Sequence, residues 1–272
     1  MKTPAAILFL FCSTVSNAAF EHLPHGGRST AMGNALVALA GNEWSAFVNP
    51  ALLRTCDERM ISLSYAPQPF QLSELARAAA SFIEPTSIGT FSFSASRFGF
   101  ELYKETRLAL SYATDLADIV SGGVTLNYYS LGIQNYGSAS SFGIDVGLMV
   151  EISDELRWGF SAFNINAAAI GAAKEKLPQI FSTGVAFEPV SNAVIAASIV
   201  KDIRYAAELH FGVEYTFIDA LALRAGTTSD PNTLNAEVGI AYAFARFDYA
   251  FSSHSELGVT HQFSISLKLG DL

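Results

Sequence analysis

Hydrophobic and polar residues alternate along most of this chain, from about residue 59 to residue 269. The last stretch, residues 258–269, shows the pattern clearly. One set of alternate positions holds Val259, His261, Phe263, Ile265, Leu267 and Leu269, and the other holds Gln262, Ser264, Ser266 and Lys268. A period of two residues places successive side chains on opposite faces of a β-strand. The pattern therefore predicts a sheet with two chemically different faces.

Each alternating run is interpreted as one strand, which predicts fourteen strands. They are expected at residues 59–65, 72–83, 87–97, 105–114, 119–131, 140–152, 155–165, 178–188, 191–200, 206–217, 220–228, 233–242, 245–252 and 258–269. An even number of strands is typical of single-chain bacterial outer-membrane barrels. The second strand has an alternative, because residues 71–80 are equally compatible with a helical turn.

The connections between these strands alternate between tight turns, such as 115–118 and 243–245, and longer loops, such as 166–177. In an outer-membrane barrel the short turns face the periplasm and the longer loops face outward. A soluble β-sandwich has no reason to keep this alternation, so an exported sandwich that acts as a binding module is the disfavoured alternative. The sequence predicts an all-β fold, a 14-stranded antiparallel transmembrane β-barrel.

The two faces of the predicted strands differ in residue size. In the strand at 206–217, Phe211 and Val213 lie on one face, and Gly212 and Glu214 lie on the other. The second face is mostly Gly, Ser and Ala, as the interior of a narrow barrel requires. We therefore expect an arginine at Val213 to be costly in the membrane, and a serine at Gly212 to be much better tolerated.

A few charged residues fall on the face predicted to point inward. They are Arg107, Asp145, Arg157, Glu214, Arg224, Glu237, Arg246, Asp248 and Lys268. These charges could line a conduction path or a binding constriction. The favoured interpretation is a set of ion pairs that fills the lumen, because buried charges need partners.

The N-terminus has the three parts of a secretory signal peptide, Met1 to Ala18. Lys2 supplies the positive charge, residues 5–12 are apolar, and Ser16-Asn17-Ala18 is a small-x-small cleavage site. The mature chain would keep a single cysteine, Cys56, so it would have no internal disulfide. With half of its residues hydrophobic, a mean hydropathy of +0.30 and a net charge of −9, the chain does not resemble a nucleic-acid-binding protein.

Residues 26–53 do not alternate. Residues 31–40 have helical composition and are followed by Gly41-Asn42, which predicts a small-residue helix with a glycine cap. Asn49-Pro50 then requires an extended or turn conformation. The predicted organisation is a signal peptide (1–18), an N-terminal hatch segment with a short helix (19–58) and the barrel (59–272).

These features resemble a known family. The glycine-rich start, the small-residue helix, the acidic-aromatic stretch and Asn49-Pro50-Ala51 are similar to the N-terminus of PorV/PorQ proteins, within the wider FadL-like group of outer-membrane proteins. Residues 247–250 and 257–265 are similar to the closing hairpin of that family. The resemblance implies a hatch inside the lumen that includes Asn49, Pro50 and Ala51, and we expect these residues to contact inward-facing charges such as Glu237 or Arg246.

The resemblance also implies two functions. PorV-type proteins serve type IX secretion by collecting exported cargo proteins, so the first hypothesis is a non-enzymatic outer-membrane protein that assists protein export or surface assembly. FadL-type proteins gate the passage of hydrophobic molecules, which is the alternative hypothesis. The chain departs from both in its short outer loops. The expected partners are outer-membrane lipid and either secretion or cargo proteins or a small hydrophobic ligand.

No motif predicts an enzyme, a cofactor or a metal site. The sequence contains no nucleophile elbow, phosphate-binding glycine loop or zinc-binding histidine motif. Ser252, His254 and Asp248 could be combined into a hydrolase set only by chance. His22 and His25 have a possible metal-ligand spacing, but no cysteine or carboxylate accompanies them.

Overall fold

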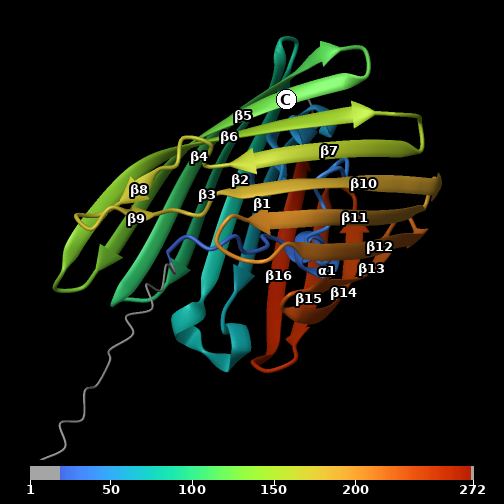
Figure 1. Cartoon of the computed structure of the whole chain (residues 1–272). Coiled ribbons are helices and arrows are strands. Elements are labelled where there is room, and N and C mark those ends of the chain that lie inside the picture. The colour runs from blue at the N-terminus through green and yellow to red at the C-terminus, as the bar shows by residue number, and fades with distance from the viewer. Residues whose placement is uncertain (1–18, 271–272) are drawn as a thin grey trace, which may run out of the picture.

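The computed structural model describes residues 19–270, so the predicted signal peptide lies outside the described residues. The described chain forms a closed barrel of fourteen antiparallel strands in the order β1-β16-β15-β14-β13-β12-β11-β10-β7-β6-β5-β4-β3-β2 (Figure 1). The strands are β1 (Arg59–Ala66), β2 (Arg77–Thr86), β3 (Gly89–Gly99), β4 (Tyr103–Ala117), β5 (Val120–Ile133), β6 (Gly137–Glu151), β7 (Leu156–Phe163), β10 (Ile180–Val190), β11 (Ala193–Asp202), β12 (Glu208–Ile218), β13 (Leu221–Ser229), β14 (Asn232–Tyr242), β15 (Ala245–His254) and β16 (Gly258–Leu269). The predicted fold class is confirmed.

Short elements complete the chain. They are helix α1 (Gly27–Ala31), the 3-10 turns η1 (Ser45–Phe47), η2 (Pro50–Thr55), η3 (Pro69–Gln71) and η4 (Ser73–Leu75), and the small hairpin of β8 (Ala169–Ile170) and β9 (Glu175–Lys176). Within the described part of the chain, no helix is both long and apolar enough to cross a membrane.

Burial follows the predicted alternation. In β16, Gln262 is 1% exposed and its neighbour Phe263 is 39% exposed, and the same contrast repeats at Ser264 and Ile265. Large hydrophobic side chains cover the outside of the wall, and Ser, Gly and Ala dominate its inside. This is the arrangement that a barrel needs when hydrocarbon surrounds it.

Several strand ends differ from the prediction. The second strand begins at Arg77 rather than at residue 72, because η3 and η4 occupy the preceding residues. Phe70 and Gln71, directly before the predicted strand, have left-handed φ angles of 55° and 65°, and η4 then keeps residues 73–75 out of the sheet. Strands β3 to β6 and β13 to β15 extend into predicted loops, so the connections at 100–102, 134–136, 230–231 and 255–257 are all tight. The alternation of short turns and long loops is therefore less regular than the sequence indicates.

We call the end of the barrel where β1 begins and β16 ends the turn end, and the opposite end the loop end. Residues 19–58, which we call the hatch, precede β1 and enter the ring of strands (Figure 1). Helix α1 contacts β13 to β16, whereas η2 contacts β3 to β6 on another part of the wall. A segment that touches such widely separated strands occupies the lumen.

The predicted helix at 31–40 is wrong. Helix α1 ends at Ala31, and Gly33 and Asn34 follow with left-handed φ angles of 60° and 58°. The hatch backbone then passes directly over the wall. A Cβ atom added to Gly226 would lie 2.5 Å from the carbonyl oxygen of Ala31. The path of the chain is therefore set by close contact with the barrel and not by helix propensity.

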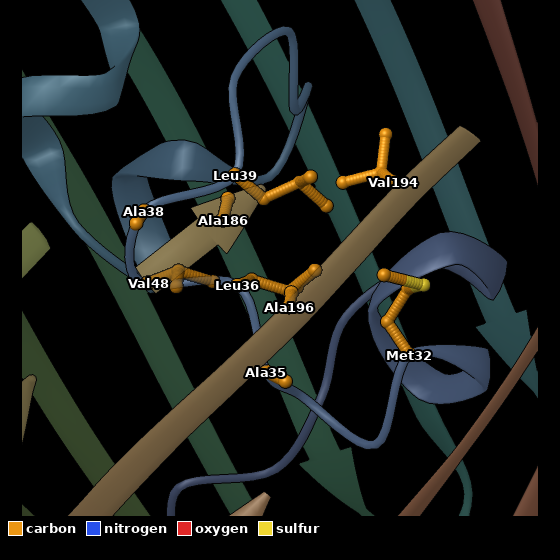
Figure 2. Close-up of a cluster of buried hydrophobic side chains, with 9 residues drawn as sticks. All are labelled: Met32, Ala35, Leu36, Ala38, Leu39, Val48, Ala186, Val194 and Ala196. Atoms are coloured by element: carbon orange, nitrogen blue, oxygen red, sulfur yellow. The ribbon is translucent and has the colours of Figure 1, made fainter. Parts of the chain in front are cut away.

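Wall glycines accommodate the hatch at several crossings. A Cβ atom would collide with hatch backbone at Gly159, which faces Val37, and at Gly212, which faces Met32. The expectation that Gly212 tolerates serine is therefore wrong, since its inward side is already filled. Beside these crossings a cluster of buried apolar side chains joins the hatch to the wall. Figure 2 shows its hatch members, Met32, Ala35, Leu36, Ala38, Leu39 and Val48, against Ala186, Val194 and Ala196 of β10 and β11.

Candidate functional site

A chain of buried ion pairs fastens the hatch to strands β12 to β15. Arg28 of the hatch donates two hydrogen bonds to Glu214, with Nε–Oε2 and Nη2–Oε1 distances of 2.7 and 3.0 Å. Arg224 bridges Glu214 and Glu237. The predicted lumenal charges of these strands are thus brought together as ion pairs.

The same network returns to the hatch through Arg246, which pairs with Glu43 of the hatch and lies 3.2 Å from Asp248 Oδ2. Glu43 is fully buried. Burial alone would raise its pKa, but the positive charge and hydrogen bond of Arg246 outweigh this effect and lower the pKa of Glu43. The hatch thus contributes the cation Arg28 and the anion Glu43 to this network. If the hatch left the lumen, their wall partners Glu214 and Arg246 would each lose one partner of opposite charge.

A second network lies on the other side of the lumen. Arg107 Nη2 donates to Asp145 Oδ2 at 2.8 Å, and Asn127 bonds both residues. The guanidinium of Arg107 also stacks 5.1 Å from the ring centre of Phe47 in the hatch. A cation and an aromatic ring thus contribute to holding the hatch here.

Two predicted lumenal charges lie apart from these networks. Arg157 pairs with Glu188 of β10. Lys268 is on the inward side of β16 but close to its turn end, where its side chain is 60% exposed and its Nζ lies 2.6 Å from Glu58 Oε2. Lys268 therefore does not belong to the buried part of the lumen.

The Asn49-Pro50-Ala51 segment lies against β5 and β6. Asn49 Nδ2 donates to the carbonyl oxygens of Val37 and Leu148 at 2.7 and 3.0 Å, and its Oδ1 accepts from the backbone N–H of Ala51. One buried side chain thus joins two hatch turns to the wall. The expected contact with Glu237 or Arg246 is absent from these bonds, because Glu43 is the hatch residue that reaches Arg246.

The other candidate sets do not assemble into sites. Asp248 is engaged with Arg246 and Ser264, whereas His254 Nδ1 accepts hydrogen bonds from the loop amides of Glu256 and Leu257. His25 packs against the rings of Trp44 and Phe47. Among the described residues, no three His, Cys, Asp or Glu side chains are placed to share a metal ion.

A largely apolar cavity of about 290 Å³ opens at the loop end, and the sequence analysis did not identify it. Its apolar lining comes from Leu23, Pro24, Pro69, Phe70, Leu75 and Phe98. Thr30, Gly33 and Asn34 of the hatch form part of its wall. These residues come from the hatch, from η3, from η4 and from β3, so no local sequence motif indicates the cavity.

A polar cavity of about 770 Å³ opens on the opposite side of the hatch, at the turn end. Hatch residues Arg28, Gly41 and Glu43 line it together with Arg224 and Arg246. Because the hatch contributes to both cavities, it separates an apolar chamber at the loop end from a charged chamber at the turn end.

Residues 19–25, which we call the strap, lie beside the apolar cavity. Glu21, His22 and Leu23 line this cavity and also a smaller one of about 60 Å³ that reaches Tyr129 and Phe163. Arg77 lines both cavities. Its hydrogen-bond contact with Gln262 is long, 3.4 Å from Nη2 to Oε1, and its buried Nε has no partner within the described chain.

The wall changes beside the smaller cavity. Hydrogen bonding between β6 and β7 stops at Val146, so residues 137–145 of β6 have no strand partner on that side. The connection that contains β8 and β9 covers this edge. Asn166 takes the place of a strand by accepting from Ile144 N and donating to Phe142 O, and Ile170 and Leu177 pack with Tyr129 and Phe20.

No protein-family profile matches the sequence, and no curated protein is similar enough to match. Solved structures do match. The toluene transporter TodX of Pseudomonas putida has a TM-score of 0.72 at 12% identity, over 92% of this chain and 99% of TodX. The toluene transporter TbuX of Ralstonia pickettii has a TM-score of 0.66 at 13% identity, over 90% and 98% of the two chains.

A FadL homologue of Pseudomonas aeruginosa also matches, with a TM-score of 0.64 at 12% identity over 90% of this chain and 98% of the homologue. At this level of identity the matches show a shared fold. The fold of this chain is that of the FadL-like outer-membrane barrels, while its resemblance to PorV/PorQ proteins in particular is not shown.

Proposed function

We propose that this protein is a non-enzymatic barrel of the bacterial outer membrane that admits small hydrophobic molecules. The observation that carries the proposal is the apolar cavity at the loop end. On the side of the turn end it is closed by the hatch, which buried ion pairs hold to the wall. Small-molecule sites are typically concave and mostly apolar, with a few polar groups that orient the ligand. The named toluene transporters share this fold, which supports the proposal.

The fixed hatch favours a sideways route over a route along the axis. A molecule in the apolar cavity meets the strap next, and beyond the strap lies the smaller cavity beside the edge of β6. The cover over this edge is held by one backbone hydrogen bond, from Ile165 N to Ile144 O, by side-chain bonds of Asn166 and by apolar contacts. Together these are weaker constraints than a continuous strand ladder. We propose that ligand leaves the barrel here.

The role in protein export that the sequence resemblance implies has no support in these comparisons. In the longest connection, between β7 and β10, Ile170 and Leu177 pack against Tyr129 of β5 with Ala139 of β6 beside them, so these side chains are not free to bind cargo. Hydrophobic uptake is therefore the better supported of the two hypotheses.

Uptake of radiolabelled toluene tests the proposal, in cells that express this protein in place of their own hydrocarbon transporter. Thr260 is buried on the inner side of β16 and lines the apolar cavity, whereas His261 points outward. Thr260→Trp fills the cavity and should lower uptake to near the rate of cells without the protein. His261→Trp is the matched control and should leave uptake unchanged. Toluene uptake that does not depend on the protein would overturn the proposal.

A further inference from the structure

Glu105, in β4, is a buried carboxylate without a cationic partner in the described chain. Its side chain is 6% exposed, and it accepts hydrogen bonds from Tyr103 Oη at 2.6 Å and from the backbone N–H of Phe20 at 2.9 Å. The charged side chains that act on it are Glu21 and Glu175, which are both acids. A positive charge beside a buried carboxylate would stabilise its ionised form, and such a charge is absent here from the described side chains.

The other strongly buried carboxylates each have an arginine. Glu43 and Asp248 pair with Arg246, Asp145 pairs with Arg107, Asp202 pairs with Arg204 and Glu237 pairs with Arg224. Glu105 is thus the exception among the buried acids that the structure describes, and it lies beside the first residues of the strap.

The backbone nitrogen of Ala19 is in a position to supply a positive charge to Glu105, because Ala19 directly precedes Phe20. Consecutive backbone nitrogens are about 3–4 Å apart by standard covalent geometry, so the nitrogen of Ala19 lies close to the Phe20 N–H that Glu105 already binds. Ala19 is itself buried, at 5% exposed. The sequence Ser16-Asn17-Ala18 directly before it is a small-x-small cleavage site.

We propose that cleavage after Ala18 creates the counter-ion of Glu105, and that this ion pair seats the strap in the barrel. A signal peptidase hydrolyses the bond between the Ala18 carbonyl carbon and the Ala19 nitrogen. Water supplies the oxygen of the new Ala18 carboxylate, and the Ala19 amine takes up a proton to become an ammonium group. An α-amino group is mostly protonated at neutral pH. The unprocessed chain has a neutral amide at the same position and cannot form the pair.

The pair would link processing to the arrangement of the cavities. The strap lines both the apolar cavity and the smaller cavity, and Phe20 packs edge-on against Tyr129 at a ring-centre distance of 4.9 Å. Tyr129 also packs with the connection that covers the edge of β6. Processing would therefore order the strap and, through Phe20, support this cover.

The test measures the acylation rate of the α-amine at pH 7 in protein purified from outer membranes, with mass spectrometry of the N-terminal peptide. Sequencing should first show that the chain begins at Ala19. We expect acylation about tenfold slower in the unaltered protein than in Glu105→Gln, because each unit by which an ion pair raises the amine pKa lowers the free-amine fraction about tenfold. Glu101→Gln, an exposed acid nearby, is the control and should react like the unaltered protein.

A second variant keeps Glu105 and moves the amine. Insertion of Gly-Ser between Ala18 and Ala19 places the new terminus two residues away, so its amine should react as fast as that of Glu105→Gln. This variant also serves if Glu105→Gln does not fold. Equal acylation rates in the unaltered protein and in the variants, or a mature chain that begins at another residue, would overturn the proposal.

Discussion

At the scale of single residues, the inner face of the wall is determined by what passes over it. Gly159 and Gly212 look like ordinary small residues in an alternating strand, yet each lies under a carbonyl group of the hatch. Asn49 likewise acts through its two donor hydrogens and its acceptor oxygen, which join Val37, Leu148 and Ala51. Buried polar groups of this kind cost about 1–3 kcal/mol when a partner is lost.

Gly159→Ala should lower the free energy of unfolding by about 1–3 kcal/mol, the usual cost of overpacking a filled interior. The added Cβ would meet the backbone of Val37 and Ala38, which cannot move aside as a flexible side chain can. The measurement is urea unfolding followed by the loss of heat-modifiable migration on gels. Gly132→Ala is the control, because its Cβ would meet a single atom at 4.0 Å. Equal stability of the two variants would contradict this account.

At the scale of elements, the strap is held by neutral, partly buried imidazole rings as well as by hydrogen bonds. Burial lowers the pKa of His22 to about 4, with further lowering by the positive charge of Arg107 and by His210, against an opposing effect of Asp202. Burial also lowers the pKa of His25, which Arg107 and Arg77 face. The strap therefore favours uncharged imidazoles, and acid should weaken its attachment.

The sign of this effect follows from proton binding. The unfolded chain takes up the His22 proton near pH 6.5 and the folded chain only near pH 4, so the stability contributed by neutral His22 is present above pH 6.5 and is lost as the pH falls to 4. The loss is at most about 3 kcal/mol. Urea unfolding at pH 7.5 and pH 4.5 should show a smaller pH dependence in His22→Gln than in the unaltered protein. Identical pH dependence in both proteins would show that the protonation of His22 does not change the free energy of unfolding.

At the scale of the whole molecule, the hatch decides whether the barrel is a pore. Ion pairs of Arg28 and Glu43 hold the hatch to β12 and β15. The apolar cluster of Figure 2 packs the hatch against β10 and β11. The hatch is therefore a fixed partition between two chambers.

Deletion of residues 26–53 should leave an inserted barrel with a higher single-channel conductance in planar bilayers, because these residues fill the lumen between the two chambers. Heat-modifiable migration on gels would verify insertion. Glu43→Gln is a useful comparison, since it removes one ion pair but keeps the backbone of the hatch, and its conductance should stay near that of the unaltered protein. An unchanged conductance after the deletion would mean that another segment closes the barrel.

The alternation of residues was sufficient to predict the wall. The last strand was expected at residues 258–269 and is found there, because the period of two depends only on neighbouring side chains and on the two different environments of a barrel wall. The inward position of Glu214, Glu237 and Asp248 follows from the same local rule. The second strand was expected from residue 72 and begins at Arg77, and the helical turn that residues 71–80 also allowed is present in part as η4.

Tertiary structure alone decided the path of the hatch, the partners of the charges and the apolar cavity. Arg246 meets Glu43 across 203 residues of sequence, and Phe20 meets Glu105 across 85. Helical composition at residues 31–40 was overridden because the hatch backbone had to fit against Gly212, Gly226 and Gly159. Alternation specifies which side of a strand faces the lumen, but the contents of the lumen depend on contacts between segments that are distant in the chain, and no local pattern encodes these contacts.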